Sequence, residues 1–417
     1  MKKFILTGFV ALVLTFSVHP QPVYTDEAGN WFERGVVAYK DGDLYGAIDA
    51  YTQALAIRQD YPEALNNRGG LHALLGDYAA AIMDCTAALA IRQDYAEAFS
   101  NRGFAYKALN NYEAAISDYL NALAIKPDFT EAWYNMGGAY FQLGDYKNAI
   151  DCQNHAITLE PDYADSYYSR ANVYYELGGY ADAVADYTQV INLAYDDAST
   201  YYNRGNAYSA QGNYESAVSD YQAALERKPD FAEAYNNLGI AYSGLQDYEQ
   251  AIESYTQALA IVPDYARAYY NRGNAYIAGP HDHDKAIADY TEAVTLDPAY
   301  IKAWLNRGAA YDDIGEYDNA LADFSHAQEL NPQDTVAYNN MGITLKKKGE
   351  YDQAIAAYTK AIEIDPQCAI ALNNRGSVYV TLADYNKAIL DFTHALEIDP
   401  SLSEADANLK VISDLAQ

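Results

Sequence analysis

Cysteine and basic residues are scarce in this chain of 417 residues. Its three cysteines (Cys85, Cys152 and Cys368) are too few to hold so long a chain together by a disulfide framework. Lysine and arginine number 27 against 58 aspartates and glutamates, which gives a formal net charge of −31. A surface with this excess of negative charge repels phosphate groups, so neither nucleic acid nor an anionic membrane surface is expected as a partner.

The sequence also lacks the motifs of an active site. It contains no glycine-rich phosphate loop, no nucleophile elbow and no Ser-His-Asp set outside the repeats described below. Two histidines with flanking aspartates at residues 281–284 form the densest group of metal-ligating side chains, but they fall in a predicted surface turn without a third distant ligand. No catalytic residue, metal site, cofactor or small-molecule substrate is therefore predicted, and the chain is not expected to be an enzyme.

Long apolar runs are missing except at the N-terminus. Lys2 and Lys3 precede an uncharged run, Phe4 to Val18, which is shorter than the roughly 20 residues of a membrane-spanning helix. This pattern is typical of a bacterial secretory signal and predicts a signal peptide at residues 1–17, followed by a linker at 18–27. The cleavage site is weakly marked, so an uncleaved N-terminal anchor stays open as the one route to membrane contact. We expect an exported protein of the bacterial periplasm or cell envelope.

Tyrosine, by contrast, is abundant, with 43 residues, and most of them recur at fixed places in an internal repeat. Shifting the chain by 34 residues aligns a series of glycines, with one extra residue in the eighth unit. Eleven units fill residues 28–402, and apolar residues every three or four positions predict a helical solenoid. Residues 403–417 are expected to form a capping helix. The units start at residues 28, 62, 96, 130, 164, 198, 232, 266, 301, 335 and 369.

The fourth unit shows which family the repeat resembles. It carries, in this order, Trp133, Met136, Gly137, Tyr140, Ala149, Ala156 and Pro161. Large and small residues at this spacing resemble the tetratricopeptide repeat (TPR), and the resemblance extends over the eleven units. It implies an all-α fold in which each unit is a pair of antiparallel helices and the units stack into a right-handed superhelix. It also implies a concave groove that binds peptides, protein segments or protein surfaces.

Two positions, counted from the start of each unit, vary together. Seven units have arginine at position 7 and aspartate at position 23, three units have neither, and only the first has the arginine alone. In a helical hairpin that turns near position 15, positions 7 and 23 face each other. The covariation therefore predicts a structural ion pair between the two helices of a unit. The predicted pairs are Arg68–Asp84, Arg102–Asp118, Arg170–Asp186, Arg204–Asp220, Arg272–Asp289, Arg307–Asp323 and Arg375–Asp391.

The family resemblance places the ligand-binding side chains on the first helix of each unit, at positions 2, 5, 6, 9, 12 and 13. In this chain positions 5, 6 and 9 are rich in asparagines and tyrosines, whose amides and phenol rings suit an extended peptide backbone and its side chains. A glycan is an alternative ligand for the same groups, and the asparagines could instead stabilise neighbouring helices. The candidate residues are Tyr134, Asn135, Tyr168, Asn172, Tyr202, Asn203, Asn206, Asn237, Tyr270, Asn271 and Asn274.

The residues present exclude one known type of TPR ligand. In the TPR family, the clamp that holds the C-terminal carboxylate of cytosolic chaperones includes lysine at position 5 and arginine at position 6 of particular units. No unit of this chain has lysine at position 5 or arginine at position 6. A receptor for chaperone tails is therefore rejected.

These observations together predict a non-catalytic scaffold that binds protein or peptide segments in its groove and assembles complexes. Two alternatives stay open. The chain could associate with itself into a structural homo-oligomer, or it could be the accessory subunit of a sugar-transfer or export machine. In the second alternative the repeats would hold the substrate while another chain performs the chemistry.

Overall fold

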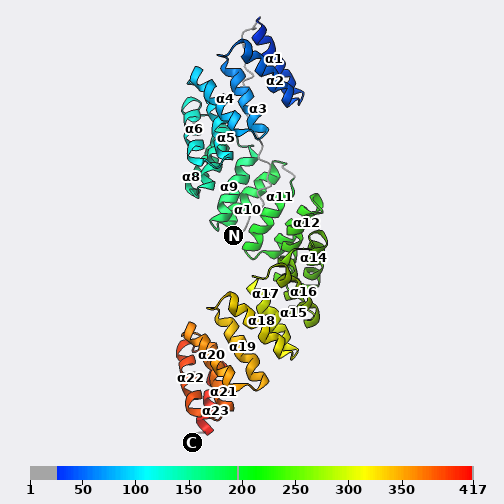
Figure 1. The fold of residues 1–417 in the computed structure, drawn as a ribbon, viewed down its shortest axis with the longest axis vertical. Coiled ribbons are helices and arrows are strands. Elements are labelled where there is room, and N and C mark those ends of the chain that lie inside the picture. The colour runs from blue at the N-terminus through cyan, green and yellow to red at the C-terminus, as the bar shows by residue number, and fades with distance from the viewer. Residues whose placement is uncertain (1–25, 195–196, 416–417) are drawn as a thin grey trace. The chain divides into compact units, whose positions relative to one another are not determined.

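The computed structural model describes residues 26–194 and 197–415, and these form 23 α-helices that divide into two compact units between Arg227 and Lys228 (Figure 1). The first unit contains α1(Glu27–Lys40), α2(Leu44–Ile57), α3(Pro62–Leu74), α4(Tyr78–Ile91), α5(Ala96–Ala108), α6(Tyr112–Ile125), α7(Thr130–Gln142), α8(Tyr146–Leu159), α9(Ala164–Glu176), α10(Tyr180–Asn192), α11(Ala198–Ala210) and α12(Tyr214–Arg227). The second contains α13(Ala232–Gly244), α14(Tyr248–Ile261), α15(Ala266–Ala278), α16(His283–Leu296), α17(Ile301–Asp313), α18(Tyr317–Leu330), α19(Thr335–Lys348), α20(Tyr351–Ile364), α21(Ala369–Thr381), α22(Tyr385–Ile398) and α23(Ser403–Leu415).

In both units each repeat is a hairpin of an odd-numbered and an even-numbered helix (Figure 1). The second helix of a repeat also packs against the first helix of the next repeat, as α4 does against α5 and α16 against α17. First helices of neighbouring repeats contact each other directly, for example α5 with α7 and α19 with α21. The predicted fold class, an all-α solenoid of stacked antiparallel helix pairs, is confirmed.

The turn inside each hairpin follows from two adjacent residues. Gly144 ends α7 with φ 76°, a left-handed conformation that glycine adopts without steric cost. Asp145 then accepts a hydrogen bond from the backbone N–H of Asn148 at 3.2 Å and so caps the start of α8. A residue with positive φ stands in the hairpin turn of the other repeats too; it is glycine in most of them and Asn110, Gln246, His281 or Ala383 in the rest.

The core of each repeat is built by large residues packed on small ones. Alanines that face the partner helix, such as Ala149 and Ala156, are fully buried. The glycine at position 8 receives an aromatic ring from position 24: a Cβ atom added to Gly342 would lie 2.5 Å from Cε1 of Tyr358. This close approach explains why glycine recurs every 34 residues, and it accounts for seven of the tyrosines as core residues. They are Tyr51, Tyr119, Tyr187, Tyr221, Tyr255, Tyr290 and Tyr358.

The C-terminal end of the second unit is covered by α23, which packs on α22 and α21 and buries Ala405 and Ile412. The predicted signal peptide at residues 1–17, and residues 18–25 of the predicted linker, lie outside the described residues. Among the helices in the described part of the chain, none combines the length and the apolar character that crossing a bilayer requires.

Candidate functional site on the first helices of the repeats

The residues at positions 2, 5, 6, 9, 12 and 13 of the first helices are called the first-helix face below. The structure places the candidate binding residues on neighbouring helices in each unit. In the first unit they lie on α7 (Tyr134, Asn135), α9 (Tyr168, Asn172) and α11 (Tyr202, Asn203, Asn206). In the second unit they lie on α13 (Asn237) and α15 (Tyr270, Asn271, Asn274).

Several of the asparagines at position 6 are engaged with the preceding repeat. Asn203 donates through Nδ2 to the hydroxyl of Tyr168 at 2.7 Å, and Asn271 donates to Oδ1 of Asn236 at 3.0 Å. The same type of bond, from position 6 to position 5 of the preceding repeat, links Asn101 to Asn66 at 3.0 Å. These amides tie first helices together, which favours the interpretation that the asparagines stabilise neighbouring helices.

The asparagines at position 9 accept hydrogen bonds from core tyrosines of their own repeat. The hydroxyl of Tyr187 donates to Oδ1 of Asn172 at 2.5 Å, and that of Tyr221 donates to Asn206 at 2.8 Å. Tyr290 and Asn274 repeat this pair at 2.8 Å. The sequence carries a signal for this bond, because each of these three repeats combines asparagine at position 9 with tyrosine at position 24, but the sequence reasoning missed it.

The tyrosines at position 5 remain partly exposed, and each packs against at least one other tyrosine ring. Tyr134 lies edge-on to Tyr163 with ring centroids 5.5 Å apart, and Tyr168 lies edge-on to Tyr187 at 5.7 Å. Tyr202 packs against Tyr221 at 6.0 Å. In the second unit Tyr270 packs against Tyr290 at 6.0 Å and Tyr300 at 4.9 Å. Such rings are held in place by packing against other aromatic side chains.

All seven arginine–aspartate pairs form in the structure. In each, Nε and one terminal nitrogen of the arginine donate to the two carboxylate oxygens at 2.7–2.8 Å, which is the bidentate geometry of a strong charge-assisted pair. The aspartates are only 4–8 % exposed. The hydrogen bonds to Asp118 raise the pKa of Arg102.

A third partner of these arginines was missed in the sequence. The remaining terminal nitrogen of Arg204 donates to Oγ1 of Thr188, at position 25 of the preceding repeat, at 3.0 Å. Equivalent bonds of 2.9–3.1 Å to threonine form in five other repeats, and Arg170 uses Asn154 instead. The sequence shows this contact as covariation. Where a repeat lacks the arginine at position 7, the repeat before it lacks threonine or asparagine at position 25. The residues at that position are Leu120, Gln222 and Ser325.

The repeats match TPR sequence families over most of the chain. The families described as tetratricopeptide repeat match residues 62–95, 196–264, 230–299, 301–334, 335–368 and 369–402, and the family described as TPR repeat matches 35–76, 105–144, 137–178 and 171–212. The chain belongs to the TPR family. None of the curated proteins matches the TPR chain in sequence.

Three solved structures resemble the chain over different lengths. YrrB, described as a TPR protein with an unusual peptide-binding site, is 26% identical, and the match covers 46% of this chain and 99% of YrrB with a TM-score of 0.40. MamA is 24% identical over 42% of this chain and 94% of its own, with a TM-score of 0.39. Yeast Tom70 is 15% identical over 93% of this chain and 95% of its own, with a TM-score of 0.43.

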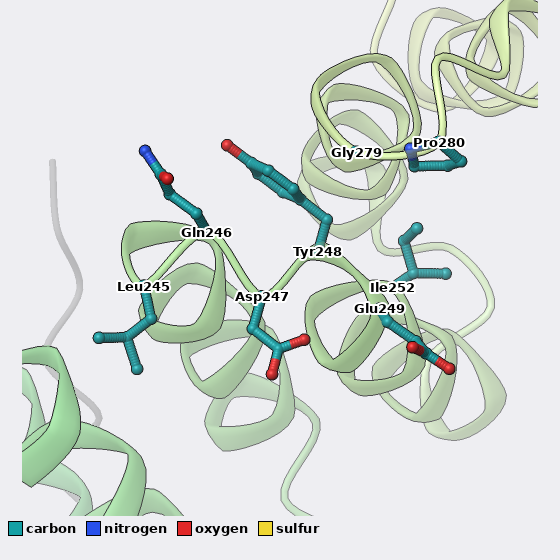
Figure 2. A pocket seen from close by; sticks show the side chains of 8 residues that line it. All are labelled: Leu245, Gln246, Asp247, Tyr248, Glu249, Ile252, Gly279 and Pro280. Atoms are coloured by element: carbon teal, nitrogen blue, oxygen red, sulfur yellow. The ribbon is translucent and has the colours of Figure 1, made fainter.

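A surface pocket of the TPR chain lies at the hairpin turn of the seventh repeat, with a volume of about 660 Å³ (Figure 2). Figure 2 shows Gln246, Asp247 and Tyr248 on one side and the turn of the eighth repeat, Gly279 and Pro280, on the other. Asp247 is engaged, because it accepts a hydrogen bond from the backbone N–H of Gln250 at 3.2 Å.

The histidines of the eighth repeat do not gather a metal site. Nδ1 of His283 lies 3.1 Å from the carbonyl oxygen of His281, and its Nε2 lies 3.5 Å from a carboxylate oxygen of Asp313. Asp282 is used to cap α16 and to pair with Lys285. Within residues 26–194 and 197–415, no three histidine, cysteine, aspartate or glutamate side chains converge as metal ligands. The three cysteines are all free, and burial raises the pKa of Cys85.

Proposed function

We propose that the chain is a non-catalytic scaffold that binds extended protein or peptide segments on its first-helix face. The TPR family and fold support a protein-binding scaffold in general. The observation that carries the finer proposal is the set of three partly exposed tyrosines, Tyr134, Tyr168 and Tyr202, at the same position of the successive helices α7, α9 and α11. We call this set the tyrosine row.

The tyrosine row would contact a peptide through its rings, since the hydroxyl of Tyr168 already accepts a hydrogen bond from Asn203. Asn172, Asn203 and Asn206 already make hydrogen bonds within the fold, so an incoming peptide would have to compete with bonds that stabilise the repeats. The rings of the row are anchored by packing and lose little conformational freedom when a ligand covers them. Contact between phenol rings and the side chains of an extended segment would then supply most of the affinity.

Replacing the tyrosine row by alanine tests this proposal. We expect that Tyr134→Ala/Tyr168→Ala/Tyr202→Ala loses a partner that the native chain captures from an envelope extract in a crosslinking pull-down. The matched control is Tyr146→Ala/Tyr180→Ala/Tyr214→Ala, which removes a tyrosine from the start of the second helix of the same three repeats. The control should capture the partner as the native chain does.

Other results of the pull-down would point elsewhere. Equal capture by the native chain and the tyrosine-row variant would contradict binding on this face. Recovery of the bait alone would favour the structural homo-oligomer, and co-purification of a glycosyltransferase or an export component would favour the accessory subunit. Circular dichroism of both variants checks that the repeats remain folded.

We also propose that the scaffold works in the bacterial periplasm or cell envelope. The support is the N-terminal pattern of Lys2 and Lys3 followed by the uncharged run from Phe4 to Val18. Expression of the full chain in a Gram-negative host, followed by fractionation and N-terminal sequencing, tests this. We expect most of the protein outside the cytoplasm, whereas a cytoplasmic chain that still begins at Met1 would contradict export.

A further inference from the structure

The first two repeats each hold a cation in the same arrangement. Arg92, at position 31 of the second repeat, lies over the ring of Tyr95 with its Cζ 4.6 Å from the ring centre, and it forms an ion pair with Glu63. Tyr95 stands at position 34 and Glu63 at position 2. In the first repeat Arg58 lies over Tyr61 at 4.7 Å and pairs with the aspartate that caps α1. An arginine at position 31 is thus held between an aromatic face and a carboxylate.

The fourth repeat has the same aromatic and acidic residues but no cation. Tyr163 stands at its position 34 and Glu131 at its position 2, whereas position 31 is Glu160 instead of arginine. Position 2 of the fifth repeat adds Asp165. Within residues 26–194 and 197–415, none of these three carboxylates forms an ion pair with a basic side chain. The fourth repeat therefore carries a negative charge at the position of the cation.

The three carboxylates lie close to Tyr163. Glu131 and Asp165 are in the first turns of α7 and α9, on the first-helix face, while Glu160 directly follows α8. Burial raises the pKa of Tyr163, and Tyr134 and the three carboxylates raise it further. Burial also raises the pKa of Asp165. The hydroxyl oxygen of Tyr163 is buried and makes no hydrogen bond to another described residue. Uncompensated negative charge and an unused acceptor are thus found together here.

The charges at positions 2 and 31 distinguish the fourth repeat from the others. Four repeats are charged at both positions, and three of them combine opposite charges. These pairs are Glu63 with Arg92, Glu97 with Lys126 and, in reversed order, Arg267 with Asp297. The fourth repeat instead combines two acids, Glu131 and Glu160. Like charges at these neighbouring positions repel each other, and a cation from outside the fold would relieve the repulsion.

We propose that Tyr163, Glu131 and Glu160 form a subsite that binds an arginine side chain of the bound segment. The inference rests on the proposed function, because it names a residue of the segment that the tyrosine row would hold. Tyr134 of the row packs edge-on against Tyr163 with ring centroids 5.5 Å apart, so the subsite adjoins the row. The guanidinium lies over the Tyr163 ring and pairs with the carboxylates, as Arg92 does within the second repeat.

The cations of the other repeats indicate arginine in preference to lysine. The cation over a tyrosine at position 34 is arginine in the first and second repeats. Where position 34 is phenylalanine, the cation is lysine: Nζ of Lys126 lies 4.6 Å from the ring centre of Phe129, and Nζ of Lys228 lies 4.5 Å from that of Phe231. A planar guanidinium stacks on a ring and still donates to carboxylates in its own plane. Tyr163 with acids on either side suits that geometry.

The test uses three pools of synthetic dodecapeptides, acetylated and amidated at their ends. Their only charged residue is arginine in the first pool and lysine in the second, and the third pool is neutral. Each pool is captured by the purified full chain and quantified by mass spectrometry. We expect the arginine pool to be captured about tenfold more strongly than the neutral pool, as one charge-assisted contact implies, and more strongly than the lysine pool.

Glu160→Arg is the decisive variant, because it gives the fourth repeat the residues that hold an arginine in the second. The introduced side chain should fill the subsite and abolish the preference for the arginine pool without changing capture of the neutral pool. Asp151→Arg makes the same change of charge at an exposed position of α8 and should keep the preference. Likewise Glu131→Gln/Glu160→Gln should lose it, whereas Glu113→Gln/Asp151→Asn, at exposed positions of α6 and α8, should keep it.

The possible failures of this experiment are distinguishable. Equal capture of the three pools by the native chain, or a preference that survives in Glu160→Arg, would overturn the subsite while leaving peptide binding intact. An equal loss of preference in Asp151→Arg would show a general attraction of cations to the acidic chain, which also overturns it. Capture of the lysine pool as strongly as the arginine pool would overturn the assignment to arginine. Failure of the native chain to capture any pool would overturn the proposed function together with the subsite.

Discussion

Replacing Arg307 by methionine should destabilise the second unit by about 3–5 kcal/mol, the usual cost of leaving one half of a buried ion pair without its partner. The side chains of Arg307 and Asp323 are only 13% and 5% exposed, and two hydrogen bonds of 2.7 and 2.8 Å join them. The variant strands the carboxylate between α17 and α18 and also removes the bond of 3.0 Å to Thr291 of the preceding repeat. Urea unfolding followed by circular dichroism measures the loss.

The double variant Arg307→Met/Asp323→Ala should recover most of this stability. The chain itself contains the replacement, because the tenth repeat has Met341 and Ala357 at the same two positions and Ala357 is packed in an apolar cluster. Removing both charges leaves no group in need of a counter-ion, and the methionine can fill much of the space of the arginine stem. Equal destabilisation by the single and double variants would show that the charge interaction is not what holds the two helices.

Raising the pH above 10 should unfold the repeats through their core tyrosines. Burial raises the pKa of Tyr51 and of Tyr255 from 10.0 to about 12, and it also raises the pKa of Tyr119, Tyr187 and Tyr221. The folded state therefore holds these phenol protons more tightly than the unfolded state does. The stabilisation is complete below pH 10 and is lost as the pH rises through 12. Tyr51 and Tyr255 should each account for about 3 kcal/mol of that loss.

Tyr255→Phe provides the matched variant for this titration. Phenylalanine fits the position, because Phe324 and Phe392 occupy it in the ninth and eleventh repeats and are buried. Urea unfolding at several pH values between about 9 and 12, with tyrosinate absorbance as a second signal, should show a smaller loss of stability for the variant than for the native chain. Parallel pH profiles for the two proteins would contradict a role for the Tyr255 phenol in alkaline unfolding.

The features that sequence predicted are those set within one repeat. Arginine at position 7 and aspartate at position 23 lie opposite each other in any hairpin that turns near position 15, so their covariation was sufficient to predict the contact. The bond from Arg204 to Thr188 crosses between repeats, and finding it required comparing position 25 of one repeat with position 7 of the next. The covariation was present in the sequence, but finding it required knowing which position of one repeat faces which position of the next.

The candidate face was harder to predict for a physical reason. The family resemblance places Asn172 and Asn203 at positions typical of TPR ligand contacts, but an amide there can equally form a hydrogen bond within its own fold. Which of the two it does depends on the distance to Tyr187 or to Tyr168, and that distance is set by how the repeats stack.

The extra residue of the eighth repeat shows where the TPR frame tolerates change. It is absorbed in the turn at Gly279–His281, and α16 still has 14 residues. Arg272 still meets Asp289 at 2.7 and 2.8 Å although the two are 17 residues apart instead of 16. The register of a repeat is thus fixed by side-chain contacts across the hairpin and not by the number of residues in its turn. Such turns are therefore the natural places to insert a fluorophore tag or an affinity epitope without displacing the helices on either side.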